Sequence, residues 1–112
     1  MIYHFCPRAD WEAAASSGSY TASSLATQGF IHCSPRDHVH VSATTRARGR
    51  TDLVVLEIDE ARLDAPSVWE EGDPPDPDGK LFPHVYGPIP IGAVVRVTDL
   101  PTEPDGTFAP LG

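Results

Sequence analysis

The sequence predicts a single α+β domain made of short strands, with two helices in its N-terminal half. Three observations support this fold class. Short apolar runs of strand length recur along the chain, and both segments of helical character lie before residue 50. The 112 residues, 40% of them hydrophobic, suffice for one core but not for two independent domains. We therefore expect one domain over residues 1–98 and a proline-rich tail over residues 99–112.

The first two elements are a strand and a helix. Ile2–Phe5 is a short apolar run that ends before Pro7, which favours a strand. Arg8–Ser17 is rich in alanine and is followed by Gly18, a typical residue just after a helix end. The residues of this helix expected to face the core recur at a spacing of three and four: Trp11, Ala14 and Ala15.

Two strand-like segments follow. Tyr20–Leu25 consists of small and β-capable residues. Gly29 then precedes Phe30–Ser34, an apolar run of strand length. We expect a strand in both.

A second helix is predicted from about Pro35 to Ala47. Ser34 supplies a hydroxyl at the N-cap position, Pro35 occupies the first helical position, and Asp37 places a carboxylate in the first turn. Gly49 ends the segment.

The rest of the domain is expected to consist mainly of strands. Leu53–Ile58 is the strongest strand signal, and Ala61–Leu63 is compatible with a single helical turn. Phe82–Tyr86 and Ala93–Val97 are two further apolar runs, separated by a turn at residues 87–90 that contains two prolines.

Two segments lack periodicity. Residues 70–79 are acidic and proline-rich, so we expect a solvated loop, of a length that is often functional or mobile. They lack the regular carboxylate spacing of a calcium-binding loop, which favours a solvating flap. From Pro101 onward, prolines and glycines indicate a frayed tail.

Charge and composition exclude several functions. Sixteen acidic residues against eight basic ones give a net charge of −8, which disfavours general nucleic-acid binding. The chain has no apolar run near the ~20 residues of a membrane span, and it does not begin like a secretory signal. Cys6 and Cys33 make no disulfide framework. We expect a cytoplasmic protein.

Three histidines occur in similar apolar, strand-like surroundings: His4, His32 and His84. Taken singly, each is compatible with a half-buried imidazole that is hydrogen-bonded to backbone. Taken together, they indicate a shared polar cleft, since the ends of paired strands converge.

A metal site is not expected, because the histidines and cysteines lack the usual ligand spacing. His38 and His40, two residues apart on a helix, would point in roughly opposite directions. His32 and Cys33 are neighbours on a strand and would face opposite sides, so they cannot form a nucleophilic pair.

Ser34 has two interpretations. Its hydroxyl can cap the following helix, or it can contact an anion at the helix start, where free amides and Arg36 would add positive potential. Arg46, Arg48 and Arg50 form the basic cluster of the chain, and a solvated face is favoured there over a phosphate clamp.

Motifs spread over residues 2–97 resemble the bacterial domain-of-unknown-function family 952. The segments that carry the resemblance are Ile2-Tyr3-His4, the Trp11 helix, Gly18-x-Tyr20, Ser24-Leu25, Gly29-Phe30-Ile31-His32-Cys33-Ser34, Leu53-x3-Glu57-Ile58-Asp59, Trp69-Glu70, Phe82-Pro83-His84-Val85-Tyr86-Gly87-Pro88 and Ala93-Val94-Val95. The resemblance implies the compact split β-sheet of ADP-ribosyltransferases and implies no established activity.

Two more distant likenesses concern enzymes that use NAD. Tyr3-His4 is similar to the opening of histidine-type ADP-ribosyltransferases, in which the histidine holds the adenosine ribose of NAD. His32-Cys33-Ser34, with the helix and strand that follow, is similar to a stretch of RNA 2′-phosphotransferases. The sequence departs from these enzymes in one respect: it has no carboxylate between Gly79 and Arg96, where such transferases place a glutamate. Glu70 and Glu57 are the possible substitutes.

These observations lead to one main hypothesis. We expect a cleft that binds a nucleotide-like or otherwise anionic small molecule, with NAD as the candidate cofactor and ADP-ribosyl or phosphate transfer as the candidate reaction. The catalytic candidates are His84, favoured because imidazole titrates near neutral pH, and His32. The candidate binding residues are His4, Ser34, Arg36 and Tyr86. The alternatives are another small-molecule enzyme on the same scaffold and a non-catalytic module for ligand or protein binding.

Overall fold

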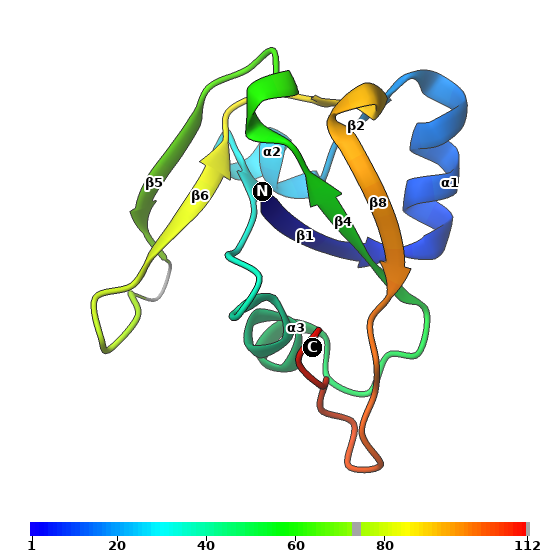
Figure 1. Ribbon diagram of the computed structural model, residues 1–112, viewed down its shortest axis with the longest axis vertical. Coiled ribbons are helices and arrows are strands. Elements are labelled where there is room, and N and C mark those ends of the chain that lie inside the picture. Colours follow the sequence, from blue (N-terminus) through cyan, green and yellow to red (C-terminus); the bar gives the residue numbers. More distant parts are fainter. Residues whose placement is uncertain (73–74, 112) are drawn as a thin grey trace.

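The computed structural model describes residues 1–72 and 75–111, in which eight strands form three small antiparallel sheets (Figure 1). The sheets are β1–β4–β8, made of Ile2–Pro7, Leu53–Ile58 and Val94–Asp99; β2–β7, made of Ser19–Tyr20 and Ile89–Pro90; and β3–β6–β5, made of Ile31–His32, Leu81–Val85 and Ser67–Glu71. With the helices described next, the protein has the α+β architecture that the sequence predicts.

Three α-helices and two short 3₁₀ helices connect these strands within the described residues. The helices are α1 (Arg8–Ser17), α2 (Ser23–Gln28), α3 (Val39–Ala47), η1 (Glu60–Arg62) and η2 (Ile91–Ala93). Helix α2 is an addition to the two predicted ones, and it replaces most of the strand expected at Tyr20–Leu25. It ends at Gly29, whose φ of 88° is readily reached only by glycine. Within residues 1–72 and 75–111, each helix is too short or too polar to cross a membrane.

Strand β4 lies at the centre of the larger sheet and separates two hydrophobic clusters. Val54, Leu56 and Ile58 pack into one cluster, which includes Ala14 of α1. Leu53 and Val55 pack into the other, on the opposite face, where α3 lies. Because both faces of β4 are buried, its sequence is almost continuously apolar rather than alternating.

Helix α1 has the predicted bounds. Gly18, with φ of 95°, donates its N–H to the carbonyl of Ala14 at 3.1 Å and so ends the helix. Ala14 is buried and Trp11 packs against the core, as expected. Ala15 is exposed, contrary to the prediction, because only a narrow stripe of this helix touches the sheet.

Helix α3 begins four residues later than predicted, at Val39. The amides of His38 and Val39 donate to the carbonyl of Pro35 at 3.1 and 3.2 Å, which forms a separate turn before the helix. Ser34 is not the N-cap, because its backbone is paired with Tyr3 of β1 in an antiparallel bridge. The predicted end of the helix at Ala47 is confirmed.

Several strand boundaries also differ from the prediction. The strand expected at Phe30–Ser34 has only Ile31–His32 in a regular ladder. The expected turn at 87–90 contains strand β7, which pairs with β2. Glu70 and Glu71, expected in a loop, are the last residues of strand β5. Residues 73 and 74 of that expected loop lie outside the described residues.

The C-terminal segment was predicted to be frayed, but it is packed against the domain. Phe108 is only 4% exposed and belongs to the cluster between β4 and α3. Its backbone N–H donates to the hydroxyl of Thr44 on α3 at 3.0 Å. The C-terminal end therefore lies beside α3 (Figure 1).

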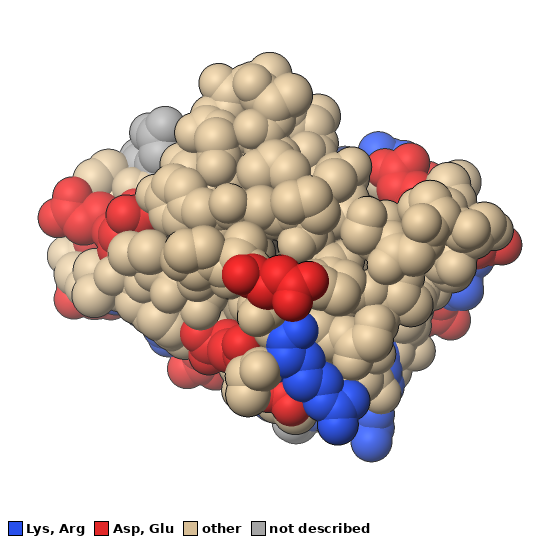
Figure 2. All heavy atoms as spheres, turned by 90° about the horizontal axis from the view of Figure 1, so that it is seen from above, with Lys and Arg blue, Asp and Glu red and all other residues tan. Residues whose placement is uncertain are grey.

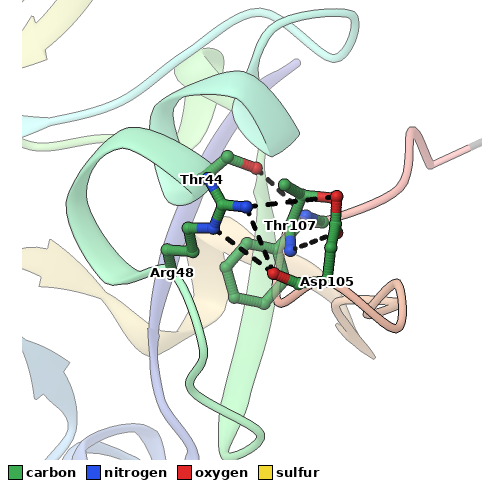
Figure 3. A network of polar contacts seen from close by, with 5 residues as sticks. Thr44, Arg48, Asp105 and Thr107 are labelled. Carbon is green, nitrogen blue, oxygen red and sulfur yellow. Dashed lines mark hydrogen bonds and ion pairs between the residues drawn. The ribbon is translucent and has the colours of Figure 1, made fainter.

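A polar network fixes the turn before Phe108 to the end of α3 (Figure 3). Arg48 donates to the carbonyl of Asp105 at 3.2 Å, and Thr107 donates its hydroxyl to the Asp105 carboxylate at 2.6 Å. Gly49 donates its N–H to the carbonyl of Gly106 at 2.9 Å. These contacts satisfy polar groups on both segments while the aromatic ring fills the core.

We expect Phe108→Ala to lower the free energy of unfolding by about 3 kcal/mol, because it leaves a cavity in the second cluster. Denaturant unfolding followed by circular dichroism measures the change. The control is Leu81→Ala, at a residue that is 44% exposed, for which we expect less than about 1 kcal/mol. Equal stability of the Phe108→Ala variant and the natural chain would contradict the packed C-terminal segment.

Candidate functional site

A pocket of about 360 Å³ lies between helix α3 and the sheet β3–β6–β5. The sheet contributes His32, Phe82 and His84 to its wall. His4 of β1 and Ser34 also line it, so the structure brings all three sequence-predicted histidines to one cavity. Gly72 and residues 75–77 lie at its edge.

Strand register explains how the sheet wall arises. His32 of β3 pairs directly with His84 of β6, so the two side chains project from the same face, with ring centroids 5.3 Å apart. On the other side of β6, Glu70 of β5 pairs with Phe82. Since alternate residues of a strand share a face, Glu70 lies on the same face as His84.

Glu70 is the immediate partner of His84. Its Oε1 atom lies 2.8 Å from Nδ1 of His84 and also accepts the hydroxyl hydrogen of Tyr86. The two hydrogen bonds hold the pKa of Glu70 below its ordinary value. The bond from Tyr86 has the larger effect and the bond from His84 the smaller one. The carboxylate is therefore ionised near neutral pH and can only accept hydrogen bonds.

This arrangement determines the tautomer of His84. Because the Glu70 carboxylate accepts, the proton of a neutral His84 ring is on Nδ1, and Nε2 carries the lone pair. Among the described residues, Nε2 has no hydrogen-bond partner. His84 is 3% exposed and its ring lies against Phe30, with centroids 4.1 Å apart and planes 16° apart. The ring is thus held in position on two sides.

His4 has a different role. Its Nδ1 lies 2.5 Å from the carbonyl oxygen of His32, and its Nε2 lies 2.7 Å from the hydroxyl of Tyr20. A carbonyl only accepts, so Nδ1 carries the proton and the Tyr20 hydroxyl donates to Nε2. Burial lowers the pKa of His4 to about 4 and outweighs the opposing effect of the hydrogen bond to the His32 carbonyl. His4 is therefore a neutral structural residue whose two nitrogens are both bonded within the protein.

The other predicted binding residues divide between two places. Ser34 lines the pocket, where its hydroxyl lies 3.2 Å from that of Ser42 on α3. Arg36 lies outside it: the guanidinium donates to the carbonyl of Leu111 at 3.2 Å and lies 5.8 Å above the centre of the Tyr3 ring. Tyr86 does not line the pocket and reaches the site through Glu70.

Sequence reasoning missed or discounted three residues of the site. Glu70 was placed in a loop because of the acidic, proline-rich residues after it, although it is the residue that follows Trp69 in a strand. Phe30 was assigned only to a strand. Ser42 lies on the pocket-facing side of α3, and the helical spacing from His38 was the signal that could have found it.

Both cysteines are free and buried. Burial raises the pKa of Cys6 to about 11 and raises that of Cys33 as well, so both thiols are protonated near neutral pH. Within the described ranges, no three histidine, cysteine or acidic side chains lie close enough together to hold a metal ion.

The sequence matches a known protein family. Residues 5–97 match the family described as "Protein of unknown function (DUF952)", so the chain belongs to that family. This confirms the family resemblance of the sequence motifs.

Solved structures of a relative agree with the fold. The crystal structure of protein CC0527 from Caulobacter crescentus is 31% identical, with a TM-score of 0.84, and the match covers 96% of this chain and 92% of that one. A crystal structure of a double mutant of CC0527 gives 30% identity, the same coverage and a TM-score of 0.83. The solution NMR structure of CC0527 gives 31% identity and a TM-score of 0.71, and the match covers 98% of this chain and 90% of that one. No curated protein matches the chain significantly.

The buried His4 makes stability depend on pH. Its folded-state pKa of about 4 lies below the ordinary 6.5, so between these pH values the unfolded chain binds one more proton than the folded chain. We therefore expect His4 to cause a loss of unfolding free energy as the pH falls from 6.5 to 4, of about 3 kcal/mol. In His4→Gln the pH slope should decrease by about one proton over this window.

Denaturant unfolding at several pH values measures this slope, and NMR of the imidazole nitrogens reports the tautomer directly. A His4 ring that titrates near pH 6.5 in the folded protein would contradict the assignment.

The Tyr86 hydroxyl is the largest cause of the lowered pKa of Glu70. We expect Tyr86→Phe to raise that pKa toward its ordinary value, because the variant removes one donor and leaves the ring. A ¹³C NMR titration of the carboxyl group measures the shift. Asp37 is the internal control, since its pKa is lowered by Lys80 and should be the same in both proteins. An unchanged Glu70 titration would show that the Tyr86 contact has no electrostatic effect.

Proposed function

We propose that the pocket binds a small nucleotide-like or otherwise anionic molecule, and that His84 acts on it as a general base supported by Glu70. The observation that carries this proposal is the 2.8 Å contact between the Glu70 carboxylate and Nδ1 of a buried histidine whose ring lines the cavity. A carboxylate-oriented imidazole at a concave site is a common arrangement for proton transfer.

The chemistry follows from the tautomer. With its proton on Nδ1, the neutral ring can take a proton at Nε2 from a ligand hydroxyl, amine or bound water. Glu70 then stabilises the imidazolium that forms, and the ring can return the proton from Nε2 to a leaving group. Tyr86 holds Glu70, and Phe30 restricts the imidazole plane, so both are positioning residues.

Size and charge support a small molecule as the partner. A volume of about 360 Å³ is at the lower end of the range of roughly 300–1,000 Å³ for ligand pockets. On the face seen in Figure 2, lysine and arginine cover a small part of a mostly uncharged surface, and acidic groups lie beside them. A nucleic acid is therefore not the partner we propose. Two free, buried cysteines accord with action in the cytoplasm.

The residues fit NAD poorly in the manner that the transferase resemblance implies. His4, the candidate for holding a ribose, has no free nitrogen. Glu70 cannot take the place of the glutamate of such transferases directly, because it is hydrogen-bonded to His84 and does not line the pocket. We assign no step to NAD, and ADP-ribosyl or phosphate transfer from it is one arm of the test below.

The proposal predicts a ligand that stabilises the protein and is converted by it. Thermal-shift measurements with NAD, ADP-ribose and nucleoside monophosphates should find a compound that stabilises by about 2.7 kcal/mol at a hundredfold excess over its Kd. Incubation with that compound, followed by mass spectrometry, should show conversion. We expect His84→Gln to reduce the rate by about 10²–10⁴-fold while the ligand still binds.

Two variants make the test specific. Glu70→Gln should also reduce the rate, because the amide cannot stabilise an imidazolium. His38→Gln, at another histidine of the pocket, should have a much smaller effect on the rate. Binding without conversion would instead favour a non-catalytic ligand-binding module. In such a module His84, like His4, would have only a structural role. Absence of stabilisation by every compound, or full activity of His84→Gln, would refute the proposal.

A further inference from the structure

We propose that the outer edge of strand β5 binds an extended segment of a partner protein, in which basic and apolar residues alternate, by adding that segment to the sheet β3–β6–β5. The five residues of β5 are not part of the pocket lining. The role of this edge is therefore independent of the function proposed above.

Strand β5 forms a regular edge of its sheet. It is the last strand in the order β3–β6–β5 and lies at one side of the molecule (Figure 1). All its residues pair with β6 without a shift of register, and Ser67–Glu71 contains no proline. The pairing of β4 with the edge strand β8, in contrast, shifts between Glu57 and Ile58. Bulges and prolines are the usual protection of an edge against further pairing, and β5 has neither.

The direction of the backbone groups of β5 follows from one hydrogen bond. Tyr86 donates its N–H to the carbonyl of Pro66, the residue opposite it, at 2.9 Å. Because hydrogen-bonded pairs alternate in an antiparallel ladder, Val68 and Glu70 are the β5 residues that bond to β6. The N–H and C=O groups of the remaining residues point outward, where β5 pairs with no other strand among the described residues. These residues are Ser67, Trp69 and Glu71.

One face of this edge has uncompensated negative charge. The Oε2 atom of Glu60 accepts the hydroxyl of Ser67 at 2.8 Å and Nε1 of Trp69 at 3.1 Å, so its carboxylate lies beside this face. Glu71 is exposed and shares the face, since alternate residues of a strand do. In the part of the chain that the structure describes, neither carboxylate has an ion pair. Trp69 is 43% exposed and can contact a cation with its ring. This face therefore favours basic side chains.

The other face of the edge favours apolar side chains. Val68 lies on it and is 41% exposed. Glu70 also lies on it, but its carboxylate is already bonded by His84 and Tyr86. Successive residues of an added strand face opposite sides, so the matching segment alternates basic and apolar residues. Its backbone provides hydrogen bonds to the edge, and its side chains provide the specificity.

A second copy of the chain fits this edge less well. Each copy has a net charge of −8, so two copies repel each other. In an antiparallel pair of β5 strands that places the two Trp69 residues opposite each other, Glu71 of each copy is opposite Ser67 of the other. Because Ser67 is bonded to Glu60, this register brings like charges together. The charge pattern thus selects a basic partner.

The test uses a heptapeptide that alternates lysine and valine, with blocked ends. We would titrate it into ¹⁵N-labelled protein and follow amide hydrogen exchange by NMR. We expect saturable binding, with exchange at least about tenfold slower at the outward amides of Ser67, Trp69 and Glu71. The amides of Val68 and Glu70 are already bonded to β6, so their exchange should change much less.

Controls separate strand addition from general attraction of a basic peptide. A heptapeptide of the same composition, with its lysines in one block and its valines in another, should bind more weakly. We expect Glu71→Lys to raise the Kd of the alternating peptide about threefold to tenfold. Glu12→Lys on α1 is the matched control: it makes the same charge change at an exposed residue on the other side of the molecule, so the Kd should remain within about twofold (Figure 1). Unfolding temperatures verify the fold of both variants.

Three outcomes would overturn the proposal. The first is the absence of saturable binding or of protection at the three outward amides. The second is equal binding of the block peptide, or an equal effect of Glu12→Lys and Glu71→Lys, either of which would show a general charge effect. The third is a dimer in sedimentation equilibrium whose outward β5 amides are protected without peptide, which would make a second copy the occupant.

Discussion

The segment 31–34 joins the two three-stranded sheets, and the site depends on this junction. On one side, β3 pairs with β6, and the N–H of Cys33 donates to the carbonyl of Pro83 at 3.0 Å. On the other side, the backbone of Ser34 exchanges two hydrogen bonds, of 2.7 and 2.8 Å, with Tyr3 of β1. One short stretch of chain therefore fixes the distance and orientation between the sheets.

The same junction explains why the buried residue His4 lies next to it. His4 donates to the carbonyl of His32, which points out of the β3 ladder, and accepts from Tyr20. Its desolvation is offset by two hydrogen bonds, and its ring stays neutral. His4 contributes to the architecture, and the proposed function assigns proton transfer to His84, whose Nε2 has no hydrogen-bond partner among the described residues.

The site combines a rigid wall with a chemically different helix. His84 and Glu70 lie on neighbouring strands of one sheet, where register determines their contact, and Phe30 restricts the ring. The α3 wall is held in place from behind by the C-terminal segment, through Phe108 and the network around Asp105. A segment far from the pocket thus supports one of its walls, because α3 packs on β4 with that segment beside it.

Local patterns of the sequence determined the α+β class, strand β4, the bounds of α1 and the end of α3, because apolar periodicity and glycine caps act over a few residues. They also indicated that His4, His32 and His84 share a cleft. Tertiary structure alone decided which of these rings is buried and neutral, that Glu70 contacts His84 across two strands, that Arg36 points away, and that the C-terminal segment packs under α3. Those features depend on register, bridge pairing and packing between residues far apart in the chain, which no short-range pattern encodes.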